Sequence, residues 1–476
     1  MTLYHSTLGQ APAVDFETAV LNGLAPDGGM YVPAEFPQVT HQQLEDWKEL
    51  SYPELAHKVL SLFIDETTVP SADLKTLINA SFSTFSHPEV IPHQPLTDDC
   101  YVQELFHGPT LSFKDVAMGF VVNLFDYFLR RRGERRTLMV ATSGDTGPAA
   151  AYASIGKTSL STWLFFPTGL ITDEQARQMT TILVPNVHSV AIDNCRNGSD
   201  DLDTLIGHCF ADDAFREEMN LSSVNSINWA RVMTQTVHYF YGYLRHAKQV
   251  GDLVNFAVPC GAFGNMCAGS MASQMGLPVG EMIVATNTNL VLSQALETGV
   301  FAKIDIKNTF ASAIDISIPM NFWRHLYFSL DGDADRIRAA WETYELKGEV
   351  RFSPAEHAAF SNGFRTYTVS DEEILATTRS LWQQENYLLD PHGAVAVAAA
   401  RHYRAHISGP IVCLATAHPS KFPETIRLAI GELPAQGCHD SLEAARSAGE
   451  RKYIFDFANM QQEVPRVMRT VMTNQF

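Results

Sequence analysis

Short hydrophobic runs alternate with more polar, amphipathic segments along much of this chain. Such runs predict strands at 137–142, 160–166, 187–192, 255–258, 282–286 and 410–415. The intervening segments, including 149–154 and 173–181, have the length and polarity of helices. Strands separated by helices favour right-handed crossovers, so we predict an α/β fold with mostly parallel twisted sheets flanked by helices.

The same pattern divides the 476 residues into four regions. We expect an N-terminal helical region (1–95), a smaller α/β domain (96–245), a larger α/β domain (246–430) and a C-terminal helical extension (431–476). Residues 308–367 are more polar and less regular, which predicts an insertion within the larger domain.

Composition and charge exclude several classes of protein. Hydrophobic residues make up 46% and charged residues 18%, which is typical of a compact enzyme and not of a disordered chain. The net charge of −19 argues against nucleic acid as a partner, because phosphate backbones require basic patches. It does not argue against an anionic small substrate, since a few local cations can outweigh the net field.

The cysteines and the N-terminus point to a reducing compartment. The 7 cysteines are scattered without a Cys-x-x-Cys pair, so we predict free thiols and neither disulfides nor a bound metal. The first residues lack a basic segment followed by an apolar one, which predicts a cytoplasmic protein. Residues 253–280 carry no charge, but Asn255, Pro259 and several glycines interrupt them, so a buried strand, loop and helix is favoured over a membrane span.

Lys114 is the strongest candidate for chemistry. A Gly-Pro-Thr turn at 108–110 precedes it, and an apolar helical run follows at once. The positive end of a helix dipole disfavours an ammonium, and an amine discouraged from carrying charge is a better nucleophile toward an aldehyde cofactor. A lone lysine is more often a solvated surface charge, so the neighbouring residues must decide.

Two further junctions between a strand and a helix carry potential anion donors. In the turn at 141–148 the backbone amides and hydroxyls could bind a substrate carboxylate; these hydroxyls belong to Thr142, Ser143 and Thr146. An ordinary helix cap explains that turn equally well. In the loop at 259–265, glycines permit a tight backbone whose amides could hold a phosphate; the residues concerned are Gly261, Ala262, Phe263, Gly264 and Asn265.

Two polar segments complete the candidates. Thr416 ends a late strand and could hydrogen-bond a pyridine nitrogen, although it could equally be a capping threonine followed by a surface lysine at 421. In the run 222–231, Arg231 with Ser226 and Asn228 suits a second oxyanion, because a guanidinium matches phosphate geometry. The alternative is a polar turn that caps a helix at 230–244.

Taken together, these segments resemble threonine synthase, a family of pyridoxal-phosphate (PLP) enzymes. The resemblance begins with His107, Pro109, Phe113 and Asp115 around the lysine, and runs through nearly the whole chain. It includes the stretches 23–33, 166–179 and 390–395 and the runs 141–147 and 222–231.

The resemblance implies a type II PLP fold in which Lys114 forms the Schiff base with PLP. It further implies that residues 261–265 bind the PLP phosphate and that Thr416 meets the ring nitrogen. In the turn at 141–148, Asp145 is a candidate to face the ring hydroxyl of such a cofactor. The implied reaction converts O-phospho-L-homoserine and water into L-threonine and phosphate. A phospholyase releasing a 2-oxo acid and a non-catalytic binding protein on the same fold stay open as alternatives, as does a monomer or a dimer.

The chain departs from the family pattern at two places. Ala262 stands where the phosphate loop often has an asparagine, which removes a side-chain donor. Near the start, Ser6-Thr7-Leu8-Gly9 lacks the basic residue of a family-like Ser-Thr-basic-Gly.

Overall fold

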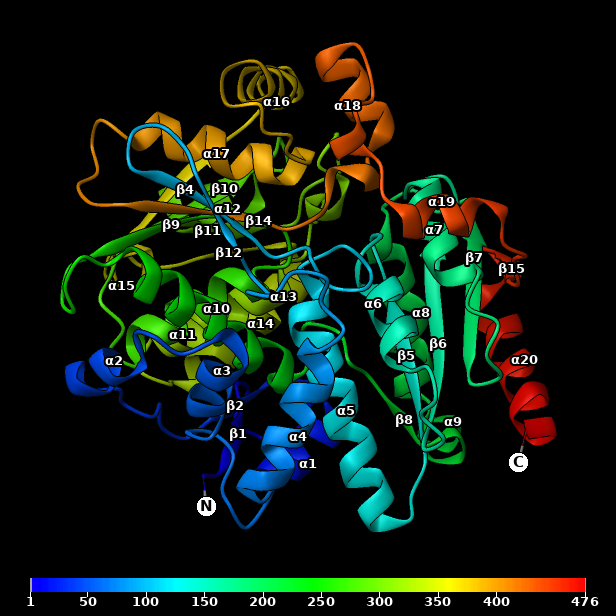
Figure 1. Cartoon of the computed structure of the whole chain (residues 1–476). Helices are drawn as coiled ribbons and strands as arrows, with labels where there is room; N and C mark the ends of the chain where they lie inside the picture. The colour runs from blue at the N-terminus through cyan, green and yellow to red at the C-terminus, as the bar shows by residue number, and fades with distance from the viewer. Residues whose placement is uncertain (1, 476) are drawn as a thin grey trace.

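Two twisted sheets form the framework of the protein, seen in a computed structural model that describes residues 2–475 (Figure 1). The six-stranded sheet has the order β13-β10-β9-β14-β4-β3, and only the β3–β4 pair is antiparallel. Its strands are β3 (His93–Pro95), β4 (Cys100–Glu104), β9 (Val254–Pro259), β10 (Val279–Thr286), β13 (Phe364–Thr368) and β14 (Ile411–Ala415).

The five-stranded sheet is parallel throughout, with the order β15-β7-β6-β5-β8. Its strands are β5 (Arg136–Ala141), β6 (Leu160–Pro167), β7 (Val187–Asp193), β8 (Leu221–Ser222) and β15 (Tyr453–Asp456). Two short antiparallel pairs lie outside the sheets, β1 (Tyr4–Ser6) with β2 (Tyr31–Pro33) and β11 (Val300–Ala302) with β12 (Glu349–Arg351). The predicted α/β class and all six predicted strands are confirmed.

Helices cover both faces of each sheet, as expected for parallel strands. The N-terminal region supplies α1 (Phe16–Asn22), α2 (His41–Trp47), α3 (Tyr52–Leu60) and α4 (Ser71–Phe82). One central core joins this region to α5 (Lys114–Arg132), α10 (Trp229–His246), α11 (Gly264–Gln274) and the inner face of each sheet. The two sheets therefore share a helical layer.

Separate cores cover the outer faces. Helix α17 (Pro391–Tyr403) packs on the six-stranded sheet beneath α16 (Asp371–Glu385), whereas α8 (Ser199–Ala211) and α20 (Met460–Gln475) pack beside the five-stranded sheet. The smaller unit also contains α6 (Thr146–Ala153), α7 (Asp173–Thr180) and α9 (Asp213–Met219). The larger unit also contains α12 (Val291–Thr298), η1 (Ser312–Ile314), α13 (Met320–Ser329), α14 (Ala334–Lys347), α15 (Pro354–Ser361), η2 (Pro419–Lys421) and α18 (Pro423–Ile430), and the chain continues through η3 (Ala435–Gly437) and α19 (Asp440–Ser447).

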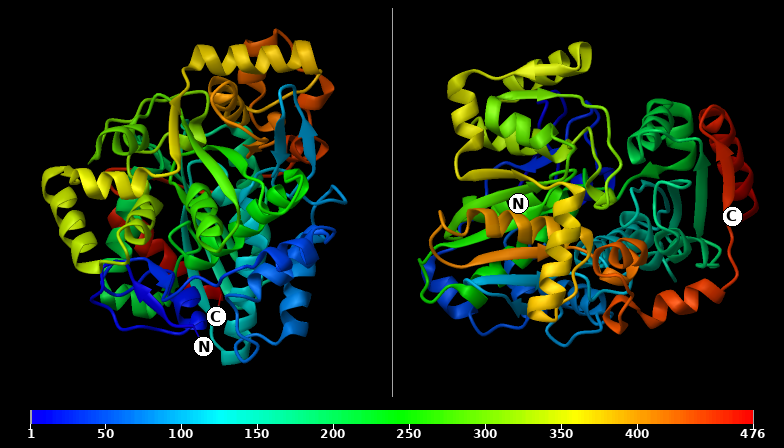
Figure 2. Two further views of the ribbon diagram at one scale, coloured as in Figure 1. Left: turned by 90° about the vertical axis from the view of Figure 1, so that its left-hand side faces the viewer. Right: turned by 90° about the horizontal axis from the view of Figure 1, so that it is seen from above.

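The chain crosses between the sheets more often than the predicted boundaries allow. Strand β4 lies in the region assigned to the smaller domain, yet it pairs with β14 in the larger sheet. The C-terminal segment is not purely helical, because β15 pairs with β7 at the edge of the smaller sheet. Figure 2 shows this orange-to-red segment passing from the larger unit to the outer side of the smaller one. The region 308–367 is also more regular than expected, and its last strand, β13, extends the larger sheet.

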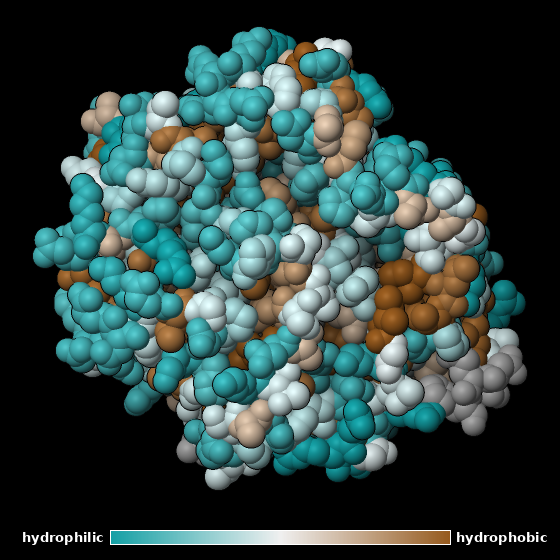
Figure 3. All heavy atoms as spheres, viewed as in Figure 1, coloured by the Kyte–Doolittle hydropathy of each residue, from teal (hydrophilic) through white to brown (hydrophobic). Residues whose placement is uncertain are grey.

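The molecular surface in the view of Figure 1 is mostly hydrophilic, and the broadest hydrophobic patch on this face lies over the part of the molecule that holds the smaller sheet (Figure 3). Within the described residues, no helix is both long enough and apolar enough to cross a bilayer. The uncharged stretch 253–280 is instead β9, a loop, α11 and the start of β10, as its interrupting residues predict.

Candidate active site

Lys114 is the first residue of α5, as the sequence pattern predicts. The preceding backbone is tied to the end of β14: Ser112 bridges Ala417, and the Phe113 amide donates to the Thr416 carbonyl oxygen at 2.8 Å. The lysine therefore lies beside Thr416, although about three hundred residues separate them in the chain.

The environment of Lys114 disfavours its charged form. Burial, followed by the nearby Arg231 guanidinium, lowers the pKa of Lys114 from 10.5 to about 7. The carboxylate of Asp145 opposes this shift, while the ammonium of Lys421 adds to it. Near neutral pH a large share of the amine is consequently free of its proton.

Asp115 shapes the loop that leads into Lys114. Its two carboxylate oxygens accept hydrogen bonds from the Thr110 amide at 2.8 Å and the Thr110 hydroxyl at 2.7 Å. Burial raises the pKa of Asp115 to about 6, although these hydrogen bonds oppose the rise. Asp115 thus supports the loop and does not line the cavity that holds the Lys114 amine.

The polar groups of the turn between β5 and α6 have two roles: some stabilise the turn, and others line the cavity. The hydroxyl of Thr142 accepts from the amides of Gly144 and Gly147, both at 3.0 Å, so it organises the turn. Ser143 and Thr146 instead line the cavity. The prediction of Thr142 as a direct substrate ligand therefore disagrees with its position.

Asp145 also lines the cavity but has a cation as its partner. It forms an ion pair with Lys421 at 2.7 Å and accepts a hydrogen bond from Gln175 at 3.0 Å. Burial alone would raise the pKa of Asp145, but Lys421 holds it below its usual range. Lys421 is fully buried, so its interpretation as a surface lysine is wrong.

The loop between β9 and α11 is the second anion-binding candidate. The loop is tight because Phe263 adopts φ 63°, whereas Gly261 and Gly264 do not have positive φ. Gly261 is needed for another reason: a Cβ there would lie 2.9 Å from the Cα of Ile314. The loop therefore presents its backbone to the cavity because the opposite wall leaves no room for a side chain.

Asn265 presents an unused donor at this loop. Its Oδ1 accepts from His238 Nε2 and from the Tyr239 hydroxyl, both at 2.9 Å. Burial lowers the pKa of His238 to about 4, so its ring is neutral and Nε2 carries the proton in this contact. The Nδ2 group is buried without a partner in a residue that lines the cavity, which suits a ligand acceptor.

The third polar segment leads into α10. Arg231 lines the cavity and is 1% exposed; one of its nitrogens donates to the Val224 carbonyl at 2.9 Å, while its Nε is buried without a partner. Ser226 also lines the cavity. Asn228 does not, because it caps α10 by accepting from the Ala230 amide and donates to the carbonyls of Val20 and Ser223. Its prediction as a substrate ligand is therefore not supported.

The remaining predicted residues meet around one cavity of about 590 Å³ at the carboxyl ends of β5, β9 and β14. This volume is sufficient for a cofactor and a small substrate together. The cavity brings together Lys114, Ser143, Asp145, Thr146, Ser226, Arg231, Gly261, Ala262, Phe263, Gly264, Asn265 and Thr416.

Sequence reasoning overlooked His392, which lines the same cavity. Its Nδ1 lies 2.7 Å from a carboxylate oxygen of Asp390, and its Nε2 accepts from the Ala313 amide at 3.0 Å. The run Asp-Pro-His-Gly at 390–393 was the available signal, since Asp390 caps α17 and fixes the ring of His392, the second residue of the helix.

Known proteins resemble this chain over nearly its full length. It is 39% identical to a threonine synthase from Pseudomonas aeruginosa, with 92% of each chain covered. Its fold matches a PLP-bound threonine synthase from Brucella melitensis with a TM-score of 0.91, at 38% identity and 99% coverage of both chains. The chain belongs to the threonine synthase family.

Family models place this relationship along the sequence. The threonine synthase N-terminal model matches residues 3–82, the PLP-dependent enzyme model 90–361 and the threonine synthase C-terminal model 393–464. A human protein named threonine synthase-like 2 is also 39% identical, with 90% of each chain covered. The chain is therefore a PLP-dependent enzyme of type II fold, within a family that includes proteins of both names.

The residues that line the cavity fit PLP. It offers an amine whose pKa is lowered to about 7 and two helix N-termini, of α6 and α11, that open onto the same space. The unpartnered Nδ2 of Asn265 supplies a side-chain donor where Ala262 lacks one. The family's cofactor therefore fits the residues present.

Proposed function

We propose that this protein is a threonine synthase that converts O-phospho-L-homoserine and water into L-threonine and inorganic phosphate. The main support for this proposal is that the Lys114 amine shares one cavity with two helix N-termini and the buried Arg231. A lysine that can lose its proton and two anion sites are what a phosphorylated amino acid and a phosphorylated cofactor require.

The cofactor would be held by its two ends. The loop at 261–265 and the Asn265 Nδ2 group would bind its phosphate, and Lys114 would bind its aldehyde carbon. Thr416 would meet the ring nitrogen, and Asp145 would face the ring hydroxyl with its charge balanced by Lys421. When bound, PLP supplies an electron-withdrawing ring that stabilises negative charge on the substrate carbon skeleton.

The protein's own groups would orient the substrate and move its protons. Ser143, Thr146 and the amides of their turn would bind the α-carboxylate, which fixes the direction of the Cα–H bond. Once the substrate amine has replaced it on the aldehyde carbon, the freed Lys114 amine, whose pKa in the chain is about 7, would accept the Cα proton and later return it.

The substrate phosphate requires a second set of donors. Ser226 and Arg231 line the cavity, and the unpartnered Arg231 Nε can donate to a phosphate oxygen. The net reaction removes phosphate from Cγ, which gains a hydrogen, and replaces one Cβ hydrogen with the hydroxyl of water. A phospholyase that forms a 2-oxo acid would release phosphate as well. Phosphate release alone therefore does not distinguish it from a threonine synthase.

Incubation of the purified protein with O-phospho-L-homoserine is the deciding experiment. We expect L-threonine and phosphate in equal amounts, measured by amino-acid analysis and a phosphate assay. A matched reaction with the Lys114→Ala variant should give neither product. Formation of 2-oxobutanoate with little threonine would refute the synthase proposal and identify a phospholyase.

A further inference from the structure

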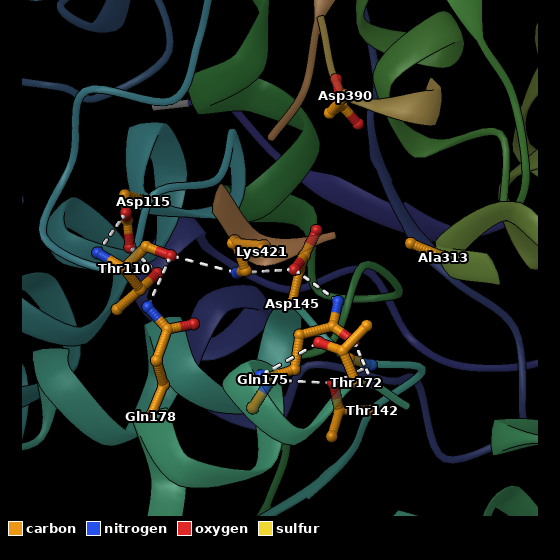
Figure 4. Close-up of polar contacts among 12 residues, drawn as sticks. Thr110, Asp115, Thr142, Asp145, Thr172, Gln175, Gln178, Ala313, Asp390 and Lys421 are labelled. Carbon is orange, nitrogen blue, oxygen red and sulfur yellow. Dashed lines mark hydrogen bonds and ion pairs between the residues drawn. The ribbon is translucent and has the colours of Figure 1, made fainter. Parts of the chain in front are cut away.

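Lys421 is a buried cation that lies at the junction of three chain segments (Figure 4). Its Nζ is 2.7 Å from Oδ1 of Asp145 and donates to the Thr110 carbonyl at 3.0 Å. Lys421 itself ends the short helix η2, which follows β14 of the larger sheet. Asp145 belongs to the smaller sheet's first strand-to-helix turn, and Thr110 to the loop before Lys114.

Hydrogen bonds from α7 complete this junction. Gln175 donates to Asp145 at 3.0 Å, and Gln178 donates to the same Thr110 carbonyl that Lys421 reaches, also at 3.0 Å. The Gln178 contact joins the smaller unit to the loop, and the Lys421–Asp145 pair joins the smaller unit to the larger one, whereas the Gln175 contact holds Asp145 from within the smaller unit. Lys421 is the charged centre of this network: it contacts Asp145, whose carboxylate acts on the Lys114 amine, and Thr110 in the loop that leads to Lys114.

We propose that Lys421 is a positioning residue that clamps the Asp145 turn to the loop before Lys114 and thereby fixes the place and the charge balance of the Lys114 amine. A buried charge that keeps two hydrogen-bonded partners can hold a geometry that neutral contacts would leave loose. The clamp also explains why a carboxylate can line a cavity intended for anions: its charge is neutralised within the wall.

The charges around Lys114 predict the direction in which its pKa changes when the Lys421–Asp145 pair is altered. Three charged groups act on its amine: Arg231 from α10 and Lys421 from η2 favour the neutral amine, and Asp145 at the start of α6 favours the ammonium. His392 from α17 lines the same cavity and acts on Asp145. Removing either member of the Lys421–Asp145 pair should therefore move the pKa of Lys114, in opposite directions.

The test measures the pKa of Lys114 in the full-length chain freed of cofactor. Trace acetylation across a pH series, read by peptide mass spectrometry, reports that pKa directly. Lys421→Met should raise it by about one unit, the smallest shift expected from losing a charge close to the amine. Asp145→Asn should lower it, and the double variant should return it close to the wild-type value because the pair is removed as a unit.

Hydrogen exchange of the same proteins tests the clamp itself. In Lys421→Met, the amides of 107–112 and of 141–147 should both exchange faster, on the order of tenfold, as expected for the loss of a charge-assisted hydrogen bond. Lys157→Met is the matched control, because Lys157 pairs with Asp126 at 3.7 Å and lies outside the cavity. It should change neither segment nor the pKa of Lys114.

The inference deepens the proposed function and rests on it for the meaning of the Lys114 amine. The measurements themselves need neither substrate nor cofactor, so a wrong carbon product would leave them unaffected. An unchanged Lys114 pKa in Lys421→Met would overturn the proposal, as would faster exchange in only one of the two segments. If Lys421→Met does not fold, Asp145→Asn and the double variant still decide: shifts of the same size in both would overturn it.

Discussion

The buried amine of Lys114 should reduce the stability of the cofactor-free chain, and Lys114→Met should relieve that cost. Methionine keeps a similar stem length but carries no charge, so it removes the unfavourable ammonium with little change in packing. The variant should therefore be more stable than the wild type near neutral pH, although it should be inactive.

The size of the effect follows from the pKa of Lys114, which is lowered from 10.5 to about 7 in the folded chain. Between those values the unfolded chain binds more protons than the folded chain, so wild-type stability rises with pH across that window. The penalty is at most about 4 kcal/mol at pH 7 and about 2 kcal/mol at pH 9, by linkage between the two pKa values. Below pH 7 both states hold the proton and the penalty is complete.

Thermal unfolding of both proteins, freed of cofactor, at pH 7, 8 and 9 measures this difference. The advantage of the variant should shrink steadily as pH rises. Lys75→Met serves as control, because Lys75 is exposed on α4 and should show no such trend. An advantage that is constant with pH, or a variant less stable than the wild type at pH 7, would refute the reasoning.

Three further predictions concern the cofactor and the substrate. The purified protein should be yellow, and borohydride reduction should place the pyridoxyl group on Lys114 by peptide mapping; a label on another lysine would contradict the central assignment. Gly261→Val should lose PLP on dialysis while its circular dichroism stays native, because a Cβ there meets Ile314 at 2.9 Å; normal retention of PLP would show that the loop is only structural. Arg231→Ala should raise KM for O-phospho-L-homoserine, at a cost of about 1.5–3 kcal/mol per lost hydrogen bond, and Arg231→Lys should recover only part of it. An unchanged KM in Arg231→Ala would place the substrate phosphate elsewhere.

Local signals in the sequence predicted much of the fold and the centre of the site. The Gly-Pro-Thr turn before an apolar run located the start of α5 at Lys114, because helix starts depend on neighbouring residues. The strands before 142 and 260 were equally clear, since continuous apolar runs between turns are typical of buried parallel strands. For that reason the two anion-binding turns were found together with their strands.

Long-range contacts explain what the sequence did not predict. Lys421 lies 311 residues from the carbonyl it contacts, so no local pattern distinguishes it from a surface lysine. Thr142 and Asn228 have the correct residue types for binding, but their polar atoms serve backbone groups that only the folded turns bring near. The sheet membership of β4 and β15 likewise depends on strand pairing across the chain, which periodicity does not report.

Because the C-terminal segment returns to the smaller sheet, it limits how this protein can be truncated or divided into fragments. Strand β15 covers the outer edge of β7, whose residues Val187–Asp193 are almost all buried. A chain truncated after α19 would leave that edge unpaired, with a row of free amides and carbonyls that invites pairing with a second molecule. Truncation after α19 should thus cause aggregation during expression, even though it removes no residue of the active-site cavity. The smaller sheet also cannot be excised as one continuous fragment, because β15 is separated in the chain from its other strands.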